Sequence, residues 1–385
     1  MENNRTLEQS IQNLQTPCYI CEEQLLENNL KLLKKVKEKS GAKILLALKG
    51  FAFSPLMPMV MKYLDGCCAS GLYEAKYAND FKAKEIHTYS AAFEESQFDE
   101  ICELSHHIVF NSINQYKTLK HKTLNKNSLG LRINPEVSTV SHDIYNPCAI
   151  NSRLGITKQN LQKAIKEDDS LFNNIEGLHF HALCEQDSTD LEIVWQKFNE
   201  DFSQYFKKLK WLNLGGGHHI TKDYYDINLL VKIIKNIKKQ YPHLDIYLEP
   251  GEAIGWKTGP LVASVLDIVN NGIDIAILDT SAEAHMSDTI IMPYKADVRH
   301  TNDKYEHKYI LAGNTCLAGD IMGTYNFKNK LQIGDKIIFE DMIHYTIVKN
   351  TTFNGIKLPS LAVFSKDSEL IIKKEFGYLD YKNRN

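Results

Sequence analysis

The sequence predicts an α/β protein that combines a parallel (β/α)8 barrel with a smaller, β-rich domain. Up to about Trp256, short apolar segments of strand length alternate with amphipathic, helix-like segments, which is the pattern of a barrel of parallel strands. Beyond that point, strand-like segments follow one another with few helices between them. A chain of 385 residues is long enough to bury two separate cores.

The barrel is expected to span residues 20–255 and to begin with a helix from Glu22 to about Lys39. The leucines of this segment recur at helical spacing and form one apolar stripe. A buried strand, Ile44–Leu48, comes next and ends at Lys49. The other seven predicted strands are Gly66–Ala69, Ile86–Tyr89, His107–Phe110, Leu129–Ile133, Ile175–His181, Trp211–Leu214 and Asp245–Glu249. The connection Asn134–Thr157 is long for a compact domain, which is typical of a functional or disordered loop.

The β-rich domain is expected to combine residues 1–19 with residues 256–385. An extended segment at Thr16–Ile20 is predicted to join its sheet. Its other predicted strands are Val262–Val269, Ile273–Leu278, Tyr309–Ala312, Lys336–Phe339, Tyr345–Val348 and Leu361–Phe364.

Composition and charge exclude several classes of function. The chain has 45 Lys and Arg residues against 48 Asp and Glu residues, and the net charge of −3 argues against nucleic acid as a partner. The polar N-terminus does not resemble a signal peptide, and no segment has the ~18 apolar residues of a membrane span. Eight cysteines without a disulfide framework indicate reduced thiols, so we expect a cytoplasmic protein. Cys18 and Cys21 have metal-ligand spacing, but no second close pair accompanies them, and no metal is expected.

Lys49 is the first candidate for chemistry, because a lysine ends a strand that is otherwise apolar. At the carboxyl end of a barrel strand the amine would reach the region where barrels bind ligands. Desolvation there lowers the pKa of an amine and makes it a nucleophile for carbonyl groups. The alternative is a lysine whose stem packs on the rim while its ammonium group pairs with a carboxylate.

The ends of three later strands also carry polar or flexible residues. The sixth strand brings His179 and His181, which could stack on a cofactor or form a metal pair. The seventh leads into Gly215–Gly217, where backbone N–H groups could surround a phosphate, although glycines also make tight turns. The eighth ends in Glu249, which could pair with a protonated ring nitrogen or make a structural ion pair.

Taken together, these motifs resemble the fold-type III pyridoxal-phosphate decarboxylases, which include ornithine and diaminopimelate decarboxylases and share the fold of alanine racemase. The matching features are the lysine after strand one, the histidine of strand six, the glycines after strand seven and Glu249-Pro-Gly after strand eight. In the second domain, Ala312–Asp320 looks like the cysteine motif of the family. Tyr345–Gly355 looks like its tyrosine and Phe-Asn-Gly signature.

The resemblance implies a role for each matching residue. Lys49 would bind the cofactor, pyridoxal 5′-phosphate, covalently, and Cys316 would donate a proton to the substrate carbon. The other cofactor contacts would be His181 on the ring, Gly215, Gly216, Gly217 and Tyr345 at the phosphate, and Glu249 at the pyridine nitrogen. Since Cys316 and Tyr345 would come from the partner subunit, the resemblance implies a homodimer in which the second domain completes shared active sites.

Three departures from the better-known decarboxylases point to a subgroup. Glu252 stands where an arginine often follows Glu-Pro-Gly, Cys184 replaces a serine that often helps to hold phosphate, and Leu317 replaces an acidic residue. The segments His142–Pro147, Ser152–Gly155 and Ser281–Asp288 resemble the carboxynorspermidine and carboxyspermidine decarboxylases. Their substrates carry a cationic polyamine tail, for which Glu252, Asp288 and Asp320 are candidate partners.

Three other interpretations stay open at this stage. The chain could decarboxylate diaminopimelate or another basic amino acid. It could be a catalytically inactive regulator of the polyamine pathway, although Lys49, Glu249 and Cys316 are all present. It could also be a metal-dependent barrel hydrolase that uses the His179 and His181 pair.

Overall fold

The computed structural model describes residues 5–385, which fold as two compact units. The barrel unit comprises residues 29–50 and 57–254. The sheet unit comprises residues 1–28, 51–56 and 255–385, and its first four residues lie outside the described part of the chain. The beginning of the predicted 1–19 segment therefore lies outside the described residues.

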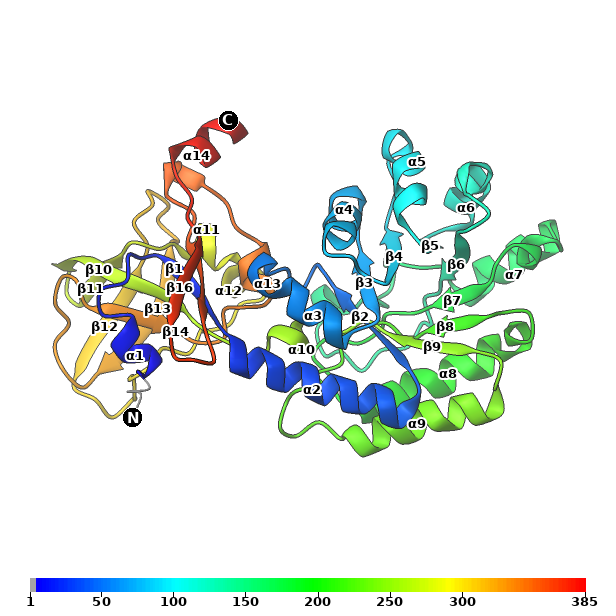
Figure 1. Ribbon diagram of the computed structural model, residues 1–385, viewed down its shortest axis with the longest axis horizontal. Helices are drawn as coiled ribbons and strands as arrows, with labels where there is room; N and C mark the ends of the chain where they lie inside the picture. The colour runs from blue at the N-terminus through cyan, green and yellow to red at the C-terminus, as the bar shows by residue number, and fades with distance from the viewer. Residues whose placement is uncertain (1–4) are drawn as a thin grey trace. The chain divides into compact units, whose positions relative to one another are not determined.

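The predicted barrel is present, and its eight parallel strands close on themselves (Figure 1). The strands are β2 (Lys43–Ala47), β3 (Gly66–Ala69), β4 (Glu85–Ser90), β5 (His107–Phe110), β6 (Ser128–Arg132), β7 (Gly177–His179), β8 (Trp211–Asn213) and β9 (Asp245–Leu248). Each overlaps one of the segments predicted from the apolar pattern, so that part of the prediction is confirmed.

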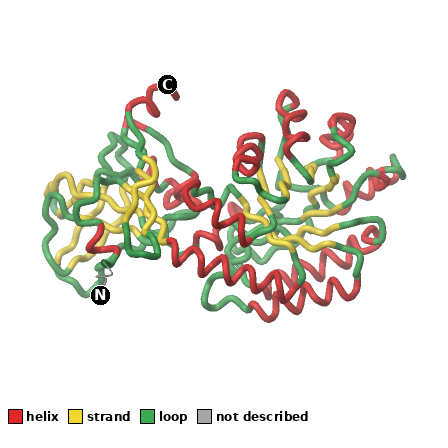
Figure 2. Tube along the Cα trace, viewed as in Figure 1, coloured by secondary structure: helices red, strands yellow, loops and turns green. Residues whose placement is uncertain are grey.

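Helices lie outside these strands, as Figure 2 shows. They are α2 (Glu23–Ser40), α3 (Met57–Tyr63), α4 (Leu72–Asp80), α5 (Glu95–Leu104), α6 (Ile113–Leu119), α7 (Lys158–Glu167), α8 (Ser188–Phe206), α9 (Ile227–Gln240) and the short α10 (Glu252–Gly255). Alternating strands and helices place the carboxyl ends of all eight strands at one mouth of the barrel. The connection from Asn134 to Thr157 is a loop that contains one short 3₁₀ turn, η3 (Asp143–Tyr145).

The opposite end of the barrel is filled by aromatic rings and a partly buried polar network. Trp211 lies against Gly177, where a Cβ atom would come within 2.0 Å of the indole ring, so only glycine fits there. Glu85 pairs with Lys43 at 2.9 Å and accepts a 2.8 Å hydrogen bond from the Tyr247 hydroxyl. This network occupies the amino-terminal ends of the strands, where barrel residues serve stability.

The sheet unit is built on an eight-stranded mixed sheet. Its strands are β1 (Cys18–Glu22), β10 (Leu261–Asn270), β11 (Asp274–Leu278), β12 (His307–Ala312), β13 (Ile321–Phe327), β14 (Lys336–Phe339), β15 (Ser360–Phe364) and β16 (Leu370–Lys374). The N-terminal strand β1 lies between β10 and β15, antiparallel to the first and parallel to the second. The N-terminal segment therefore belongs to this sheet, as its extended pattern predicted. Leu7, in the short helix α1 (Leu7–Ser10), packs with Ile11 and Leu14 on the core of this sheet.

One predicted strand is wrong and two strands were missed. Tyr345–Val348 forms a short helix, α13, although its β-branched residues favoured a strand. The Asn350 amide donates hydrogen bonds to the carbonyls of Thr346 and Ile347, and these local contacts stabilise the turn. Strands β13 and β16 were missed because glycine, asparagine and lysines interrupt their apolar pattern. The C-terminal residues form a last helix, α14 (Tyr378–Arg384), and none of the helices within residues 5–385 could cross a membrane.

Candidate active site

Lys49 lies two residues after β2 at the mouth of the barrel. Its side chain is exposed at the mouth, while neighbouring protein atoms desolvate its amino group. Burial lowers the pKa of this amine below its ordinary value, and the positive charge of Arg132 lowers it further. A larger fraction of the amine is therefore uncharged at neutral pH, which is the form that attacks carbonyl groups.

Glu249 follows β9 and is only 7% exposed. The Asn213 amide donates a 2.6 Å hydrogen bond to its Oε1 atom, and His179 Nε2 lies 3.5 Å from Oε2. Burial alone would raise the pKa of this carboxyl, but the two nearby histidines, His179 and His87, and the Asn213 amide outweigh burial, so the pKa is lowered. The site thus holds a buried carboxylate, which suits the pairing of a protonated ring nitrogen.

His181 lies just beyond β7, and its orientation is fixed by the glycine turn. The backbone N–H of Gly216 donates a 2.9 Å hydrogen bond to Nδ1 of the ring. Burial lowers the pKa of His181 well below its ordinary value, and the neighbouring charge of Lys49 acts in the same direction. His181 therefore presents a neutral ring held in one orientation, as a residue that stacks on a cofactor requires.

The glycines after β8 are required by close packing. A Cβ atom at Gly216 would lie 2.2 Å from the Glu249 carbonyl oxygen, and one at Gly217 would lie 2.1 Å from that of Leu183. Two of the three N–H groups already have acceptors within the protein, because Gly215 donates to Asn213 Oδ1 at 2.9 Å and Gly216 donates to His181. The turn therefore offers a phosphate fewer backbone donors than the three glycines suggest.

Two polar residues of the site were not singled out from the sequence. Asn213 bonds to both Glu249 and the glycine turn. Its position as a polar residue at the end of a buried strand could have identified it in the sequence. Arg132, at the end of β6, is 5% exposed, and its guanidinium lies 4.6 Å from the centre of the Tyr89 ring. Its Nη2 atom donates a 3.4 Å hydrogen bond to the His181 carbonyl.

Glu252, the first residue of α10, lies beside a histidine of the preceding loop. His219 Nε2 is 3.0 Å from Oε2 of Glu252. The ring is 2% exposed. The carboxylate of Glu252 thus lies next to a buried histidine of the barrel unit.

The remaining predicted site residues belong to the sheet unit. Cys316 is exposed, and its backbone N–H donates a 2.6 Å hydrogen bond to Asn354 Oδ1. This contact joins the cysteine motif to the Phe-Asn-Gly segment, which are 38 residues apart in the chain. The two motifs recognised separately in the sequence are therefore brought together.

Asp320 and Asp288 are both buried, and both have partners in the sheet unit. Asp320 accepts hydrogen bonds from the Ser281 hydroxyl at 3.0 Å, the Ala282 N–H at 2.7 Å and the Thr315 hydroxyl at 2.6 Å. These contacts account for its burial and hold the cysteine loop.

Asp288 forms an ion pair with Lys349. The same ammonium lies 5.0 Å from the centre of the Tyr345 ring, so Asp288, Lys349 and Tyr345 form one cluster.

Two groups of side chains within residues 5–385 could offer three metal ligands. They are Glu85, His87 and His107 in the barrel interior, and Glu185, His219 and Glu252 near the glycine turn. Neither group contains His179 or His181, which the hydrolase interpretation requires.

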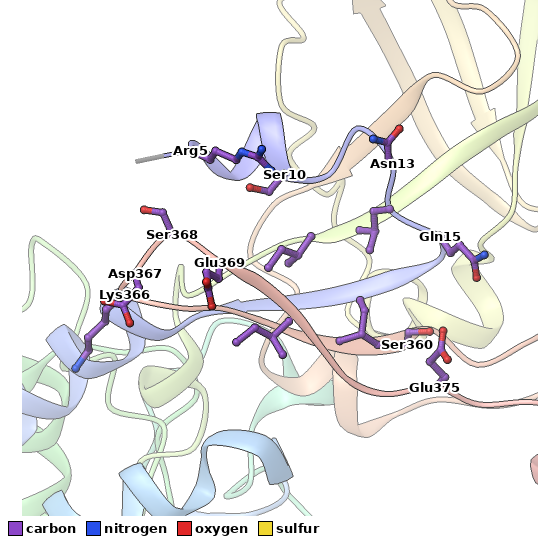
Figure 3. Close-up of a pocket in the computed structure, with 14 residues that line it drawn as sticks. Arg5, Ser10, Asn13, Gln15, Ser360, Lys366, Asp367, Ser368, Glu369 and Glu375 are labelled. Carbon is purple, nitrogen blue, oxygen red and sulfur yellow. The ribbon is translucent and has the colours of Figure 1, made fainter. Parts of the chain in front are cut away.

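A hollow of about 1170 Å³ lies in the sheet unit (Figure 3). It is lined by the N-terminal segment and by the turn between β15 and β16. Charges of both signs line it, among them Arg5, Lys366, Asp367 and Glu369. None of the predicted site residues contributes to it, and we assign it no function.

Comparison with known proteins identifies the family. Residues 18–343 match the family model described as pyridoxal-dependent decarboxylase, C-terminal sheet domain. The chain is 54% identical to a carboxynorspermidine/carboxyspermidine decarboxylase of Campylobacter jejuni, over 97% of this chain and 99% of that protein. It is 39% identical to a carboxyaminopropylagmatine decarboxylase of Synechocystis, over 97% and 96% of the two chains.

A solved structure agrees with these matches. The crystal structure of carboxynorspermidine decarboxylase from Campylobacter jejuni in complex with norspermidine superposes with a TM-score of 0.89. The match has 53% identity and covers 97% of this chain and 100% of the other. The chain therefore belongs to the family of pyridoxal-dependent decarboxylases, and its cofactor is pyridoxal 5′-phosphate.

Proposed function

We propose that this protein removes the carboxyl group of carboxynorspermidine, carboxyspermidine or both, and releases norspermidine or spermidine and carbon dioxide. The observation that carries the proposal is the likeness to the Campylobacter jejuni enzyme over nearly the full length of both chains. That the related crystal structure contains norspermidine supports a polyamine product.

The residues of the barrel mouth fit the cofactor that the family uses. Lys49 offers an amine with a lowered pKa, which favours covalent attachment of an aldehyde. The neutral ring of His181 would pack on the cofactor ring, and the Glu249 carboxylate would hold a proton on its pyridine nitrogen. When bound, the cofactor supplies an electron sink for the bonding pair that carbon dioxide leaves behind.

The exposed thiol of Cys316 would return a proton to the carbon that lost carbon dioxide. Tyr345 would approach the phosphate. Glu252, Asp288 and Asp320 remain candidate partners for the substrate amines. All three carboxylates have partners within their own unit, so each would act while it keeps those contacts.

The first experiment combines a visible absorption spectrum with carbon dioxide release from a panel of substrates. The panel contains carboxynorspermidine, carboxyspermidine, carboxyaminopropylagmatine, diaminopimelate, ornithine and arginine. We expect a yellow protein that prefers the carboxypolyamines, and Lys49→Ala should abolish both colour and activity. Lys163→Ala, which changes an exposed lysine of α7, is the matched control. A preference for diaminopimelate would refute the proposed substrate, and a protein that binds cofactor but releases no carbon dioxide would favour a regulator.

We further propose a homodimer in which the sheet unit of one subunit completes the barrel mouth of the other. The support is that the site residues divide between two units, with Lys49, His181 and Glu249 on one and Cys316 and Tyr345 on the other. None of the eight cysteines forms a disulfide within residues 5–385, which fits the reducing conditions of the cytoplasm.

Subunit mixing tests this shared site. Lys49→Ala and Cys316→Ala should each be inactive alone, while an equal mixture should regain about a quarter of wild-type activity, because half the dimers are mixed and have one intact site. A mixture that stays inactive while native mass spectrometry shows mixed dimers would contradict shared sites.

A further inference from the structure

Arg132 is a buried cation at the mouth of the barrel, and it lacks a carboxylate partner. It is the last residue of β6 and is 5% exposed. A buried charge is costly unless an opposite charge or several hydrogen bonds compensate for it. Within residues 5–385, no carboxylate lies within ion-pair distance of its guanidinium. This points to a bound molecule as the source of the compensating negative charge.

The hydrogen bonds of this guanidinium are also incomplete. An arginine side chain has five N–H donors in a planar fork. The Nη2 atom of Arg132 donates a long, 3.4 Å bond to the His181 carbonyl, and the Tyr89 oxygen is a second acceptor. By contrast, Arg299 in the sheet unit makes two bonds, of 2.5 and 3.1 Å, to the Glu340 carboxylate. Most of the Arg132 donors therefore remain for a ligand.

Neighbouring side chains hold Arg132 in one place. Its guanidinium lies 4.6 Å from the centre of the Tyr89 ring, and the Tyr89 hydroxyl donates a 2.8 Å hydrogen bond to Asn111 Oδ1. The Asn111 side chain in turn donates to the Arg153 carbonyl at 2.9 Å and accepts from the Gly155 N–H at 2.7 Å. The surface under the guanidinium is thus fixed before any ligand binds, which favours tight binding.

The surroundings of Arg132 are the residues that fit the cofactor. It bonds to the backbone of His181, and besides burial its charge lowers the pKa of the Lys49 amine, so Arg132 is near both groups. A molecule joined at that amine brings its own oxygens with it. The cofactor has a phenolate on the carbon next to the one that bears its aldehyde, and the substrate has a carboxylate next to its reacting amine. Arg153 also lies near Tyr89, but it is exposed, so water solvates its charge.

The order of the strands separates Arg132 from the expected phosphate position. The glycine turn follows β8, whereas the Tyr89 ring under the guanidinium belongs to β4. These strands are four places apart in a closed barrel of eight, so they lie on opposite sides of the mouth. The phosphate arm and the phenolate oxygen of the cofactor likewise flank its aldehyde-bearing carbon on opposite sides. With the phosphate at the glycine turn, the phenolate edge faces the side of Arg132.

We propose that Arg132 binds an oxyanion of the molecule that is joined at Lys49, either the phenolate of pyridoxal 5′-phosphate or the carboxylate of the substrate. Tyr89 is then a positioning residue that acts through Arg132. This inference rests on the cofactor and the decarboxylation within the proposed function, but it does not depend on which substrate the protein prefers.

The first arm of the test compares two cofactors that differ only in the phenolate oxygen. Cofactor-free wild type and Arg132→Met are titrated with pyridoxal 5′-phosphate and with its 3-deoxy analogue, and binding is followed by quenching of tryptophan fluorescence. If the phenolate is the partner, Arg132→Met should weaken pyridoxal 5′-phosphate by about 10- to 100-fold, the effect of losing a charged hydrogen bond. The affinity for the analogue should stay within about twofold.

The second arm compares two ligands that differ only in the carboxylate. Protein loaded with cofactor is given the substrate that the panel identifies, and the decarboxylated product serves as an inhibitor. If the carboxylate is the partner, Arg132→Met should raise KM for the substrate by about 10- to 100-fold and leave the inhibition constant of the product within about twofold. Any loss common to both ligands of a pair cancels in the comparison.

Two further variants make the test independent of the folding of Arg132→Met. Arg132→Lys keeps the positive charge but loses the planar fork, and it should show the same selectivity with a loss of about threefold to tenfold. Tyr89→Phe keeps the ring but loses the bond to Asn111, and its selective loss should be smaller than that of Arg132→Met, because Tyr89 acts through Arg132. Arg5→Met, which removes an exposed arginine of the sheet unit, is the control and should change none of these values.

A selective loss in either arm supports the proposal and names the oxyanion. The proposal is overturned if Arg132→Met and Arg132→Lys weaken both ligands of each pair equally, or weaken none, because Arg132 would then be a structural residue only. A preference for diaminopimelate in the substrate panel would refute the proposed substrate but leave both arms intact, since the first needs no substrate and the second uses whichever substrate the panel identifies.

Discussion

Replacing His107 with phenylalanine is expected to reduce the sensitivity of the barrel to acid. The His107 ring stacks on His87 with centroids 3.8 Å apart, and Trp211 and Tyr247 lie beside it. Burial, together with the charge of His87, lowers its pKa from the usual value of 6.5 to about 2. Its Nδ1 atom is buried without a hydrogen-bond partner among the described residues.

The sign and size of the effect follow from these values. Between pH 6.5 and about pH 2 the unfolded chain binds a proton at His107 that the folded chain does not bind, so stability is complete above pH 6.5 and falls as the pH drops. At pH 5 the loss from this residue is about 2 kcal/mol. Phenylalanine keeps the stacked ring and removes the titrating group.

Urea unfolding of wild type and His107→Phe at pH 7.5 and pH 5, followed by tryptophan fluorescence, measures the difference. The variant should lose about 2 kcal/mol less between the two pH values. The other buried histidines, such as His218, whose pKa burial lowers to about 4, titrate in both proteins. Their contributions to the pH dependence of stability therefore cancel in the comparison. His121→Gln, which changes an exposed histidine, is the control. Equal losses in wild type and His107→Phe would refute the reasoning.

Three further predictions concern the site. Glu249→Gln should bind cofactor with nearly unchanged affinity but lower kcat by about 100-fold or more, because an amide cannot hold a proton on the pyridine nitrogen. Steady-state kinetics measures this, and an unchanged kcat would contradict it. Gly216→Ala should weaken cofactor binding at least about tenfold while the circular dichroism spectrum stays unchanged. The added Cβ atom would lie 2.2 Å from the Glu249 carbonyl oxygen, so the turn must move. Unaltered cofactor binding would contradict this. Asp320→Ala should destabilise the sheet unit by about 2 to 4 kcal/mol in thermal unfolding, because three hydrogen-bond donors lose their acceptor. A change below about 0.5 kcal/mol would exclude this structural role.

The sequence by itself determined the barrel and the identity of the residues at its mouth. Apolar strands buried on both faces leave a strong local signal, and chain order then places each strand end at the same mouth. Lys49, His181 and Glu249 could therefore be found as interruptions of apolar segments. Strand β1 could also be predicted from the sequence, because its apolar and β-branched residues agree with its burial in the sheet.

Only the tertiary structure decided the conformation of segments with weak local signals. It alone also decided which side chains from distant segments become partners. Tyr345–Val348 is helical although its four residues prefer a strand, and the Asn350 side chain that bonds to this turn also accepts a 3.4 Å hydrogen bond from the hydroxyl of the distant Tyr19. The three acids predicted to meet the substrate all have partners in the protein, and nothing in their own segments revealed this. A carboxylate's role depends on which donor is within 3 Å, and for Glu252 that donor is His219, which lies 33 positions earlier in the chain.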